Sequence, residues 1–206
     1  MATDNFTGSN GTELTTYSGS WATANALSSD FIIDTNALRT PFSRSSTLTA
    51  YYQGTFADDQ YAQGTLVQIG SDNMFMGVAV RVSALGNAYT FYADTNSWVL
   101  AKLVGGSYTE LDLDFVTINT NDVLYIEASG TTVTAKINGV TVSTVTDSSI
   151  TSGNPGVTGN GSASSGTYTL LDNWTGADLA AAGQPAGVRG RGVPGMSDRQ
   201  RFGRGW

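Results

Sequence analysis

The stretch from Val123 to Val145 constrains the fold of this chain more than any other segment. In its middle, residues 132–137 alternate between polar and apolar side chains, a pattern typical of a half-buried β-strand. Gly130 lies just before this run, and Asn138-Gly139, the residue pair favoured in type I′ hairpin turns, follows it. We therefore expect three antiparallel strands with one apolar face, which a second layer must cover.

Further strand candidates follow one another along the chain, separated by short turns. They are residues 31–38, 46–53, 61–69, 74–82, 88–93, 97–104, 108–115 and 167–174. Residues 148–166 are rich in Gly, Ser and Asn, which predicts a long loop. Regularly spaced short strands without a convincing helix predict an all-β fold, a two-sheet antiparallel jelly-roll sandwich.

Two short segments at opposite ends of the strand-rich region are similar to each other. Asp4-Asn5-Phe6-Thr7-Gly8 opens the chain, and Asp172-Asn173-Trp174-Thr175-Gly176 comes near the end of the last strand candidate. We expect these segments to form strands that lie side by side.

The composition excludes several kinds of chemistry. The chain has no Cys and no His, so disulfides, His-dependent nucleophiles and His-ligated metals are excluded. It has no apolar run long enough to cross a bilayer, so we expect no membrane insertion. It has no secretion signal, so we expect it to be synthesised in a host cytoplasm. Residues 1–182 hold 16 of the 17 acidic residues and five of the ten basic ones, so nucleic acid is an unfavourable partner for the body of the protein.

The chain resembles the concanavalin A-like lectin and glucanase superfamily, in particular its laminin-G-like branch. The resemblance rests on Asp4-Asn5-Phe6-Thr7-Gly8, Ile137-Asn138-Gly139-Val140, Gly153-Asn154-Pro155-Gly156 and Leu171-Asp172-Asn173-Trp174. It implies a jelly roll over residues 1–182 that binds glycans or protein surfaces with its concave face or loop rim. The resemblance alone implies no activity, because members of such a fold perform different functions.

One strand candidate carries a row of acidic residues. If residues 108–115 form a regular strand, Glu110, Asp112 and Asp114 share one face, and a pair of carboxyl groups is what a retaining glycosidase requires. The row resembles the signature of laminarinase-type members of the superfamily, except that the last position is Asp114 instead of Glu. The alternative is a solvent-facing row with Leu111, Leu113 and Phe115 directed at the core. We favour that alternative, so we expect no enzymatic activity.

Other residues are candidates for ligand binding. Aromatic side chains on polar strand faces can stack against sugar rings, and Tyr52, Tyr92 and Trp98 occupy such positions. Laminin-G-like domains often bind calcium at a loop rim, so the resemblance makes Asp72 and Asp94 weak candidates for calcium ligands. Carboxylate oxygens are suitable ligands for that ion, but no loop in the sequence has the spacing of an EF-hand. We expect no cofactor, with calcium as the alternative.

Residues 183–206 differ from the rest in composition, and hold five of the ten basic residues and one of the 17 acidic ones. Rich in Gly, Pro and Arg, this segment cannot form a core of its own. We expect it to be an extended tail that anchors the protein to other virion proteins or to copies of itself. The anchoring candidates are Arg189, Arg191, Arg199, Arg201, Phe202, Arg204 and Trp206.

Together these features predict a non-enzymatic virion protein of a tailed phage, a capsid decoration, tail or fibre component. Its lectin-like module would be displayed on the particle and touch cell-surface glycans. The alternative is a glycoside hydrolase or lyase on the same fold that uses the acidic row.

Overall fold

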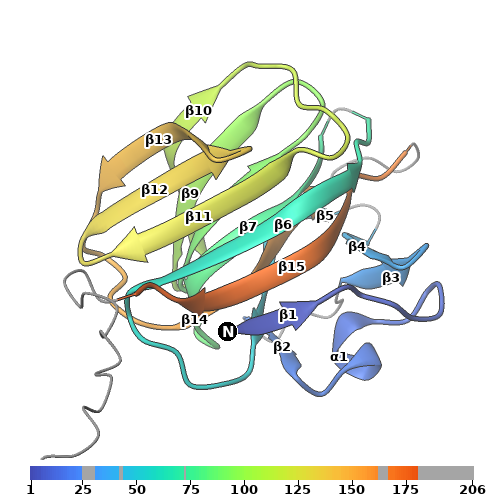
Figure 1. Ribbon diagram of the computed structural model, residues 1–206, viewed down its shortest axis with the longest axis horizontal. Coiled ribbons are helices and arrows are strands. Elements are labelled where there is room, and N and C mark those ends of the chain that lie inside the picture. The colour runs from blue at the N-terminus through green and yellow to red at the C-terminus, as the bar shows by residue number, and fades with distance from the viewer. Residues whose placement is uncertain (25–30, 42–43, 72, 162–166, 181–206) are drawn as a thin grey trace, which may run out of the picture.

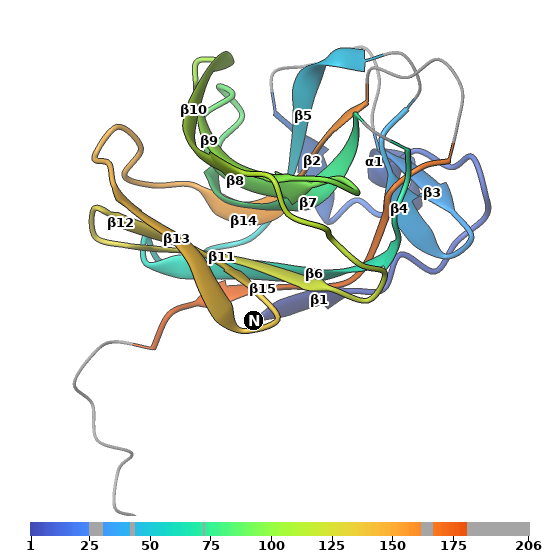
Figure 2. The ribbon, with the colours of Figure 1, turned by 90° about the horizontal axis from the view of Figure 1, so that it is seen from above.

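The computed structural model describes residues 1–24, 31–41, 44–71, 73–161 and 167–180. Over these ranges the chain forms two antiparallel sheets that pack face to face (Figure 1 and Figure 2). The expected all-β sandwich is therefore confirmed. None of the helices in these ranges has the length and hydropathy needed to span a bilayer.

Each sheet is assembled from strands that are distant in sequence. Sheet A contains, in spatial order, β13 (Val140–Thr146), β12 (Thr132–Ile137), β11 (Val123–Ser129), β6 (Gln60–Gln68), β15 (Leu170–Asp178), β4 (Ala37–Arg39) and β3 (Ile32–Asp34), and β1 (Ala2–Asp4) also pairs with β15. Sheet B contains β10 (Ser107–Asp114), β9 (Trp98–Val104), β8 (Ala88–Ala93), β7 (Met74–Val82), β14 (Asn154–Gly161), β5 (Arg44–Tyr52) and β2 (Trp21–Thr23). One short helix, α1 (Leu14–Tyr17), lies between β1 and β2 in the chain.

The meander predicted from the sequence is present as β11, β12 and β13. Asn138 and Gly139, which connect β12 to β13, have φ values of 52° and 80°, as a type I′ turn requires. Val133 and Ala135 are fully buried, whereas Thr132 on the alternating face is exposed. The period of the hydrophobic pattern thus fixes which face of the meander covers the core.

The two ends of the strand-rich region lie side by side, but Asp4 is the one residue of the segment 4–8 that belongs to a strand. β1 pairs antiparallel with β15, with Asp4 opposite Trp174 and Ala2 opposite Gly176. The carboxylate of Asp4 accepts hydrogen bonds from the Trp21 indole N–H at 2.8 Å and the Tyr17 hydroxyl at 3.0 Å. Asp4 therefore ties the first strand to the helix and to sheet B.

Two expectations about local structure were wrong. Residues 31–38 form no single strand, because Thr35 and Asn36 both have positive φ and close a tight hairpin between β3 and β4. Residues 148–166 contain strand β14, which pairs with β7 on one side and β5 on the other. β14 is rich in Gly because its neighbours approach closely: a Cβ on Gly156 would lie 2.1 Å from the carbonyl oxygen of Ala50.

The core lies between the sheets and contains large aromatic side chains. Trp21 and Trp174 meet edge to face with ring centroids 4.7 Å apart, and Tyr52 stacks on Trp174 at 5.6 Å. Phe91 and Leu66 are also fully buried. This packing fixes sheet B against sheet A.

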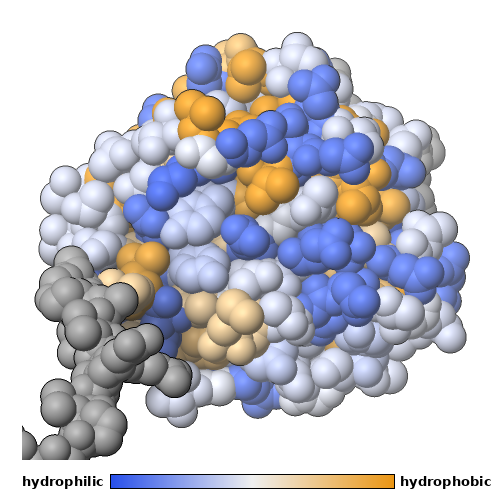
Figure 3. Space-filling view, in the orientation of Figure 1, coloured by the Kyte–Doolittle hydropathy of each residue, from blue (hydrophilic) through white to orange (hydrophobic). Residues whose placement is uncertain are grey.

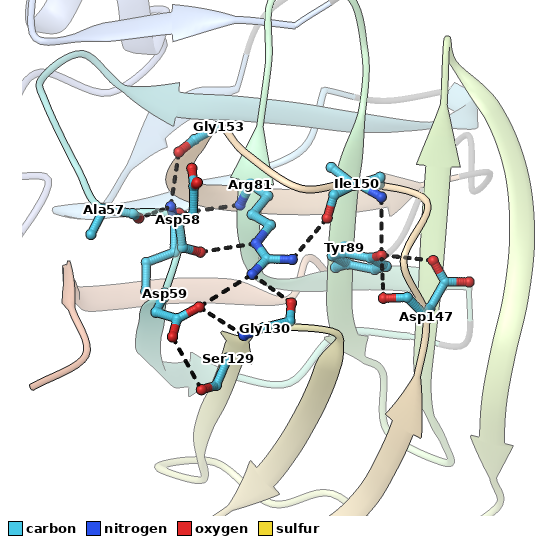
Figure 4. Close-up of polar contacts among 11 residues, drawn as sticks. Ala57, Asp58, Asp59, Arg81, Tyr89, Ser129, Gly130, Asp147, Ile150 and Gly153 are labelled. Atoms are coloured by element: carbon cyan, nitrogen blue, oxygen red, sulfur yellow. Dashed lines mark hydrogen bonds and ion pairs between the residues drawn. The ribbon is translucent and has the colours of Figure 1, made fainter. Parts of the chain in front are cut away.

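A buried arginine joins the loops at one end of the sandwich (Figure 4). Arg81 on β7 has a φ of 53°, which turns its side chain inward, and only 2% of the residue is exposed. Its guanidinium donates to the carbonyl oxygens of Asp58, Ile150 and Gly130 at 2.8–2.9 Å. A buried charge that is hydrogen-bonded to three separate segments is expected to fix the positions of those segments.

Candidate functional site

The outer face of sheet B is concave. Figure 2 shows β9 and β10 turned up at one side of the sheet and β5 at the other. Small residues occupy the middle of this face, since Gly77, Thr90, Ala101 and Thr158 all lie there and the last three are fully buried. These small side chains leave space above the middle of the sheet for larger side chains from neighbouring positions.

Tyr92 on β8 is the large side chain next to these small residues, directly opposite Gly77. A Cβ on Gly77 would lie 2.5 Å from the Cα of Tyr92, so this glycine is needed for the close approach of the two strands. The Tyr92 ring meets Phe75 edge to face at 5.3 Å, and its hydroxyl is hydrogen-bonded to Thr47 and, at 3.1 Å, to the hydroxyl of Tyr108. Burial, with a further contribution from the bond to Tyr108, raises the pKa of Tyr92 well above its ordinary value, so the hydroxyl remains protonated.

An apolar cluster and two exposed polar side chains surround Tyr92. Phe75 and Leu113 are half-buried and pack with Tyr92, Val99 and Ala101. Tyr108 is 46% exposed, and Glu110 is also exposed. Glu110 lies opposite Ala101 in the ladder, so it is on the concave side. We call Phe75, Tyr92, Tyr108, Glu110 and Leu113 the concave site.

The predicted row of three carboxylates on one face of β10 is not formed. The β9–β10 register shifts between Glu110 and Asp112, where a β-bulge changes the alternation. Asp112 consequently faces sheet A and accepts a hydrogen bond of 2.6 Å from the Ser143 hydroxyl on β13. Asp114 lies opposite Trp98 and lines a different pocket, of about 370 Å³, at the edge of the sandwich. Glu110 is the member of the row that remains on the concave face.

The three aromatic residues predicted to bind glycans are not brought together. Tyr92 belongs to the concave site, whereas Tyr52 packs between Trp21 and Trp174 in the core. Trp98 is 3% exposed and packs near Phe91. Tyr52 and Trp98 are thus placed as core residues, although Trp98 also lines the pocket that contains Asp114.

The residues described in the structure give no support for a metal site. Asp94 is buried, and its carboxylate accepts hydrogen bonds from the Asn73, Asn96 and Ser97 backbone N–H groups and from the Ser97 hydroxyl. Its bonding is that of a turn-forming aspartate. No group of three or more acidic side chains in the described ranges is placed to hold a metal ion. Asp72 lies outside those ranges.

The anchoring candidates in residues 183–206 also lie outside the described residues. Described residues that the sequence analysis did not select contribute to the concave site. Tyr108 shares a strand face with Glu110 two residues later, and Phe75 lies on the outer face of β7, directly opposite Asn160. An aromatic residue two positions from an acidic one on an edge strand is a signal that could have identified Tyr108.

Comparisons with known proteins establish the fold. No protein-family model matches the sequence, and no curated protein matches it. The structure is similar to the carbohydrate-binding module CBM66 from Bacillus subtilis, with a TM-score of 0.61 and 16% identity over 77% of this chain and 96% of the module. It is also similar to the GH43 protein BlXynB from Bacillus licheniformis, with a TM-score of 0.60 and 11% identity over 86% of this chain and 39% of BlXynB.

A third structure of the same kind is a Bacillus subtilis protein of unknown function with a galectin-like fold. Its TM-score is 0.57, with 9% identity over 86% of this chain and 95% of that protein. At such identities the likeness concerns the fold alone. The chain therefore has the concanavalin A-like jelly-roll fold that its sequence resembles.

Proposed function

We propose that this protein is a glycan-binding module whose concave site holds the sugar. The observation that carries the proposal is the position of Tyr108, a half-exposed aromatic ring fixed by the buried hydroxyl of Tyr92 and placed on the same strand face as Glu110. Sugar recognition combines an apolar ring face with directed hydrogen bonds. Tyr108 supplies the aromatic surface and Glu110 the acceptor.

The neighbouring side chains suit this purpose. Phe75 and Leu113 provide half-buried apolar surface next to Tyr92. Binding sites for small ligands are commonly built from such apolar surface with a few fixed polar groups. The Tyr108 side chain is already held by the buried hydroxyl of Tyr92, so it loses little freedom when a ligand binds. This lowers the entropic penalty of association.

We propose binding without cleavage. Hydrolysis of a glycosidic bond generally requires two carboxyl groups on either side of the scissile bond. The bulge in β10 leaves Glu110 on the concave face and turns Asp112 and Asp114 toward the other side of the sheet. The fold itself is compatible with both roles, since solved structures that share it include a carbohydrate-binding module and a GH43 protein.

The wider setting of a virus particle is a proposal that rests on the sequence alone. Residues 183–206 would attach the module to other virion proteins or to copies of itself, and the concave site would face cell-surface glycans. The composition of residues 183–206, with five Arg residues in a Gly-rich and Pro-rich segment, is the observation that supports this part of the proposal.

Affinity electrophoresis in native gels that contain a soluble polysaccharide tests the proposed binding. Levan, arabinoxylan and mixed-linkage β-glucan are suitable probes. We expect at least one of them to retard the protein. Tyr108→Ala should greatly reduce the retardation, because it removes an exposed ring from the site without opening the core. Thr109→Ala is the matched control, since Thr109 is exposed on the same strand but points to the other face.

A reducing-sugar assay with the same polysaccharides tests the absence of cleavage. Products released by the wild type and lost in Glu110→Gln would contradict a purely binding role. Equal retardation of Tyr108→Ala and Thr109→Ala would contradict the concave site.

A further inference from the structure

The outer face of sheet A, opposite the concave site, carries a stack of three side chains at its centre. Lys136 on β12 places its Nζ 4.6 Å from the centroid of the Tyr125 ring on β11. Tyr125 in turn stacks on Tyr61 of β6, with centroids 5.3 Å apart and planes inclined by 21°. Lys136, Tyr125 and Tyr61 form what we call the tyrosine stack, and Tyr61 is its end on the side toward β15.

Glu127 holds the tyrosine stack in place. Its Oε2 accepts a hydrogen bond of 2.6 Å from the Tyr125 hydroxyl and a charged one of 3.3 Å from Lys136. Burial, followed by the bond to Glu127, raises the pKa of Tyr125 well above its ordinary value. The Lys136 and Glu127 charges are paired with each other, so the stack presents rings and hydroxyls with no net charge between them.

A polar pocket lies two strands away on the same sheet. It has a volume of about 560 Å³ where β1 meets β15. Its lining is mainly amides, hydroxyls and a carboxylate, from Thr3, Asp4, Asn5, Tyr17, Asn173, Trp174 and Thr175. We call this the seam pocket.

One cross-strand row connects the seam pocket to the tyrosine stack. Thr3 lies opposite Thr175, Thr175 opposite Gln63, and Gln63 opposite Tyr125. Residues opposite one another in a ladder point to the same side of the sheet. The row therefore places hydroxyl and amide groups between the pocket and the rings. Because neighbouring strands are about 4.8 Å apart, Tyr61 and β1 are separated by about 10 Å, which is about two sugar rings.

We propose that the tyrosine stack and the seam pocket form a second carbohydrate-binding site for a neutral oligosaccharide or polysaccharide chain. The chain lies across β6, β15 and β1. One sugar ring packs against Tyr61, and the next hydrogen-bonds to the amides and hydroxyls of the seam pocket. This site is separate from the concave site, so it goes beyond the proposed function and does not depend on it.

The chemistry of this face favours a sugar over a protein partner. Figure 3 shows the face, with hydrophilic and intermediate side chains over most of the area and hydrophobic ones in separate patches. Protein interfaces need a buried apolar centre. A neutral sugar instead needs an aromatic ring with nearby hydrogen-bonding groups, which Tyr61, Gln63 and the seam pocket provide. The pairing of Lys136 with Glu127 argues against a charged ligand.

The test uses the full-length protein and native gels containing levan, arabinoxylan or mixed-linkage β-glucan. We expect Tyr61→Ala to weaken binding to a retarding polysaccharide about tenfold, the equivalent of one lost stacking contact. Tyr61→Phe keeps the ring and should bind almost as the wild type does. Thr144→Ala is the control, because Thr144 is exposed at the far edge of the same face. Asn5 is an exposed residue that lines the seam pocket. If Tyr61→Ala fails to fold, Asn5→Ala tests the contribution of the seam pocket to binding.

The outcomes separate this proposal from the concave site. Loss of binding in Tyr61→Ala, or in Asn5→Ala, with Tyr108→Ala unchanged supports the second site and contradicts the concave one. Loss in both Tyr61→Ala and Tyr108→Ala supports two sites. Wild-type binding by Tyr61→Ala and Asn5→Ala, equal to that of Thr144→Ala, overturns the second site. Failure of all three polysaccharides to retard the wild-type protein overturns both.

Discussion

The hydroxyl of Tyr92 lies 3.1 Å from the hydroxyl of Tyr108, and this contact joins the middle of sheet B to its edge strand. Tyr92 is 4% exposed and Tyr108 is 46% exposed. The hydroxyl of buried Tyr92 therefore fixes the orientation of exposed Tyr108 through a hydrogen bond to its hydroxyl. The contact connects packing to function, because the orientation of Tyr108 determines what the concave site can bind.

Tyr92→Phe should weaken glycan binding while leaving the fold intact. The change removes the hydroxyl that holds Tyr108 but keeps the ring that packs on Phe75. A net hydrogen bond is worth about 1 kcal/mol, so we expect about fivefold weaker binding. Titration of the wild type and the variant with the same polysaccharide measures the effect. Tyr51→Phe, a half-buried tyrosine on β5 of the same sheet, should bind normally; equal loss in both variants would contradict the role of Tyr92.

Arg81→Ala should destabilise the protein by about 3–5 kcal/mol, because it removes a fully buried side chain and leaves the buried carbonyl group of Ile150 without its donor. The free energy of unfolding in urea measures this loss. Arg39→Lys is the comparison: the ion pair of Arg39 with Asp34 is partly exposed, and we expect a change of about 1 kcal/mol or less. Similar values for the two variants would show that the Arg81 contacts contribute little.

Gly77→Ala should cost about 3 kcal/mol or more, or prevent folding. The added Cβ would lie 2.1 Å from the carbonyl oxygen of Phe91 and 2.5 Å from the Cα of Tyr92, and neither backbone atom can move freely. Gly19→Ala provides the control, because no heavy atom lies within 4 Å of its added Cβ. Thermal unfolding of the two variants side by side measures the difference. A Gly77→Ala protein as stable as Gly19→Ala would mean that β7 and β8 are spaced more widely.

The protein should lose stability in alkaline solution through its buried tyrosines, and Tyr17 and Tyr89 are two of them. Burial, then the hydrogen bond to Asp4, raises the pKa of Tyr17 to about 12, and burial, then the hydrogen bond to Asp147, raises that of Tyr89 to about 12. Because an unfolded tyrosine has a pKa of about 10, this stabilisation is complete below pH 10 and is lost as the pH rises toward 12. The midpoint of thermal unfolding, measured between about pH 9 and pH 12, follows the loss.

The matched variant in the alkaline experiment is Tyr17→Phe. It removes one of the tyrosines whose pKa is raised by folding, so its unfolding midpoint should fall less steeply over the same pH range. A slope equal to that of the wild type would show that Tyr17 does not contribute.

A chain that ends at Ala182 should fold as stably as the full-length protein. The last backbone contact of the described body is the bond from the Leu179 N–H to the Asp59 carbonyl, which this truncation keeps. If residues 183–206 are an anchor, the shortened chain should fail to join particles or larger assemblies. Mass measurement of both forms, alone and with candidate particles, tests this. Normal incorporation of the shortened chain would contradict the anchor.

The sequence predicted those parts of the fold where local pattern and tertiary environment agree. The alternation in residues 132–137 and the Asn138-Gly139 turn identified the meander, and the pairing of β1 with β15 followed from two similar segments. β14 could not be predicted in the same way. Its Pro and Gly residues have low strand propensity, and only the close approach of β5 and β7 makes small residues necessary there.

The candidate sites were less predictable, because they depend on register and on contacts between distant strands. A single bulge after Glu110 separates it from Asp112, and no local pattern reveals the bulge. Tyr61 stacks on Tyr125, which lies on a strand that is distant in sequence and adjacent in space. Trp98 was a candidate from its position on a predicted strand and is nevertheless a core residue.

Native affinity electrophoresis of the wild type beside Tyr108→Ala, in gels with each of the three polysaccharides, tests the central claim most directly. The concave site predicts that at least one polysaccharide retards the wild type and that Tyr108→Ala is retarded much less than the wild type. Equal retardation of the two proteins, or no retardation of the wild type by any of the three, would contradict glycan binding at this site.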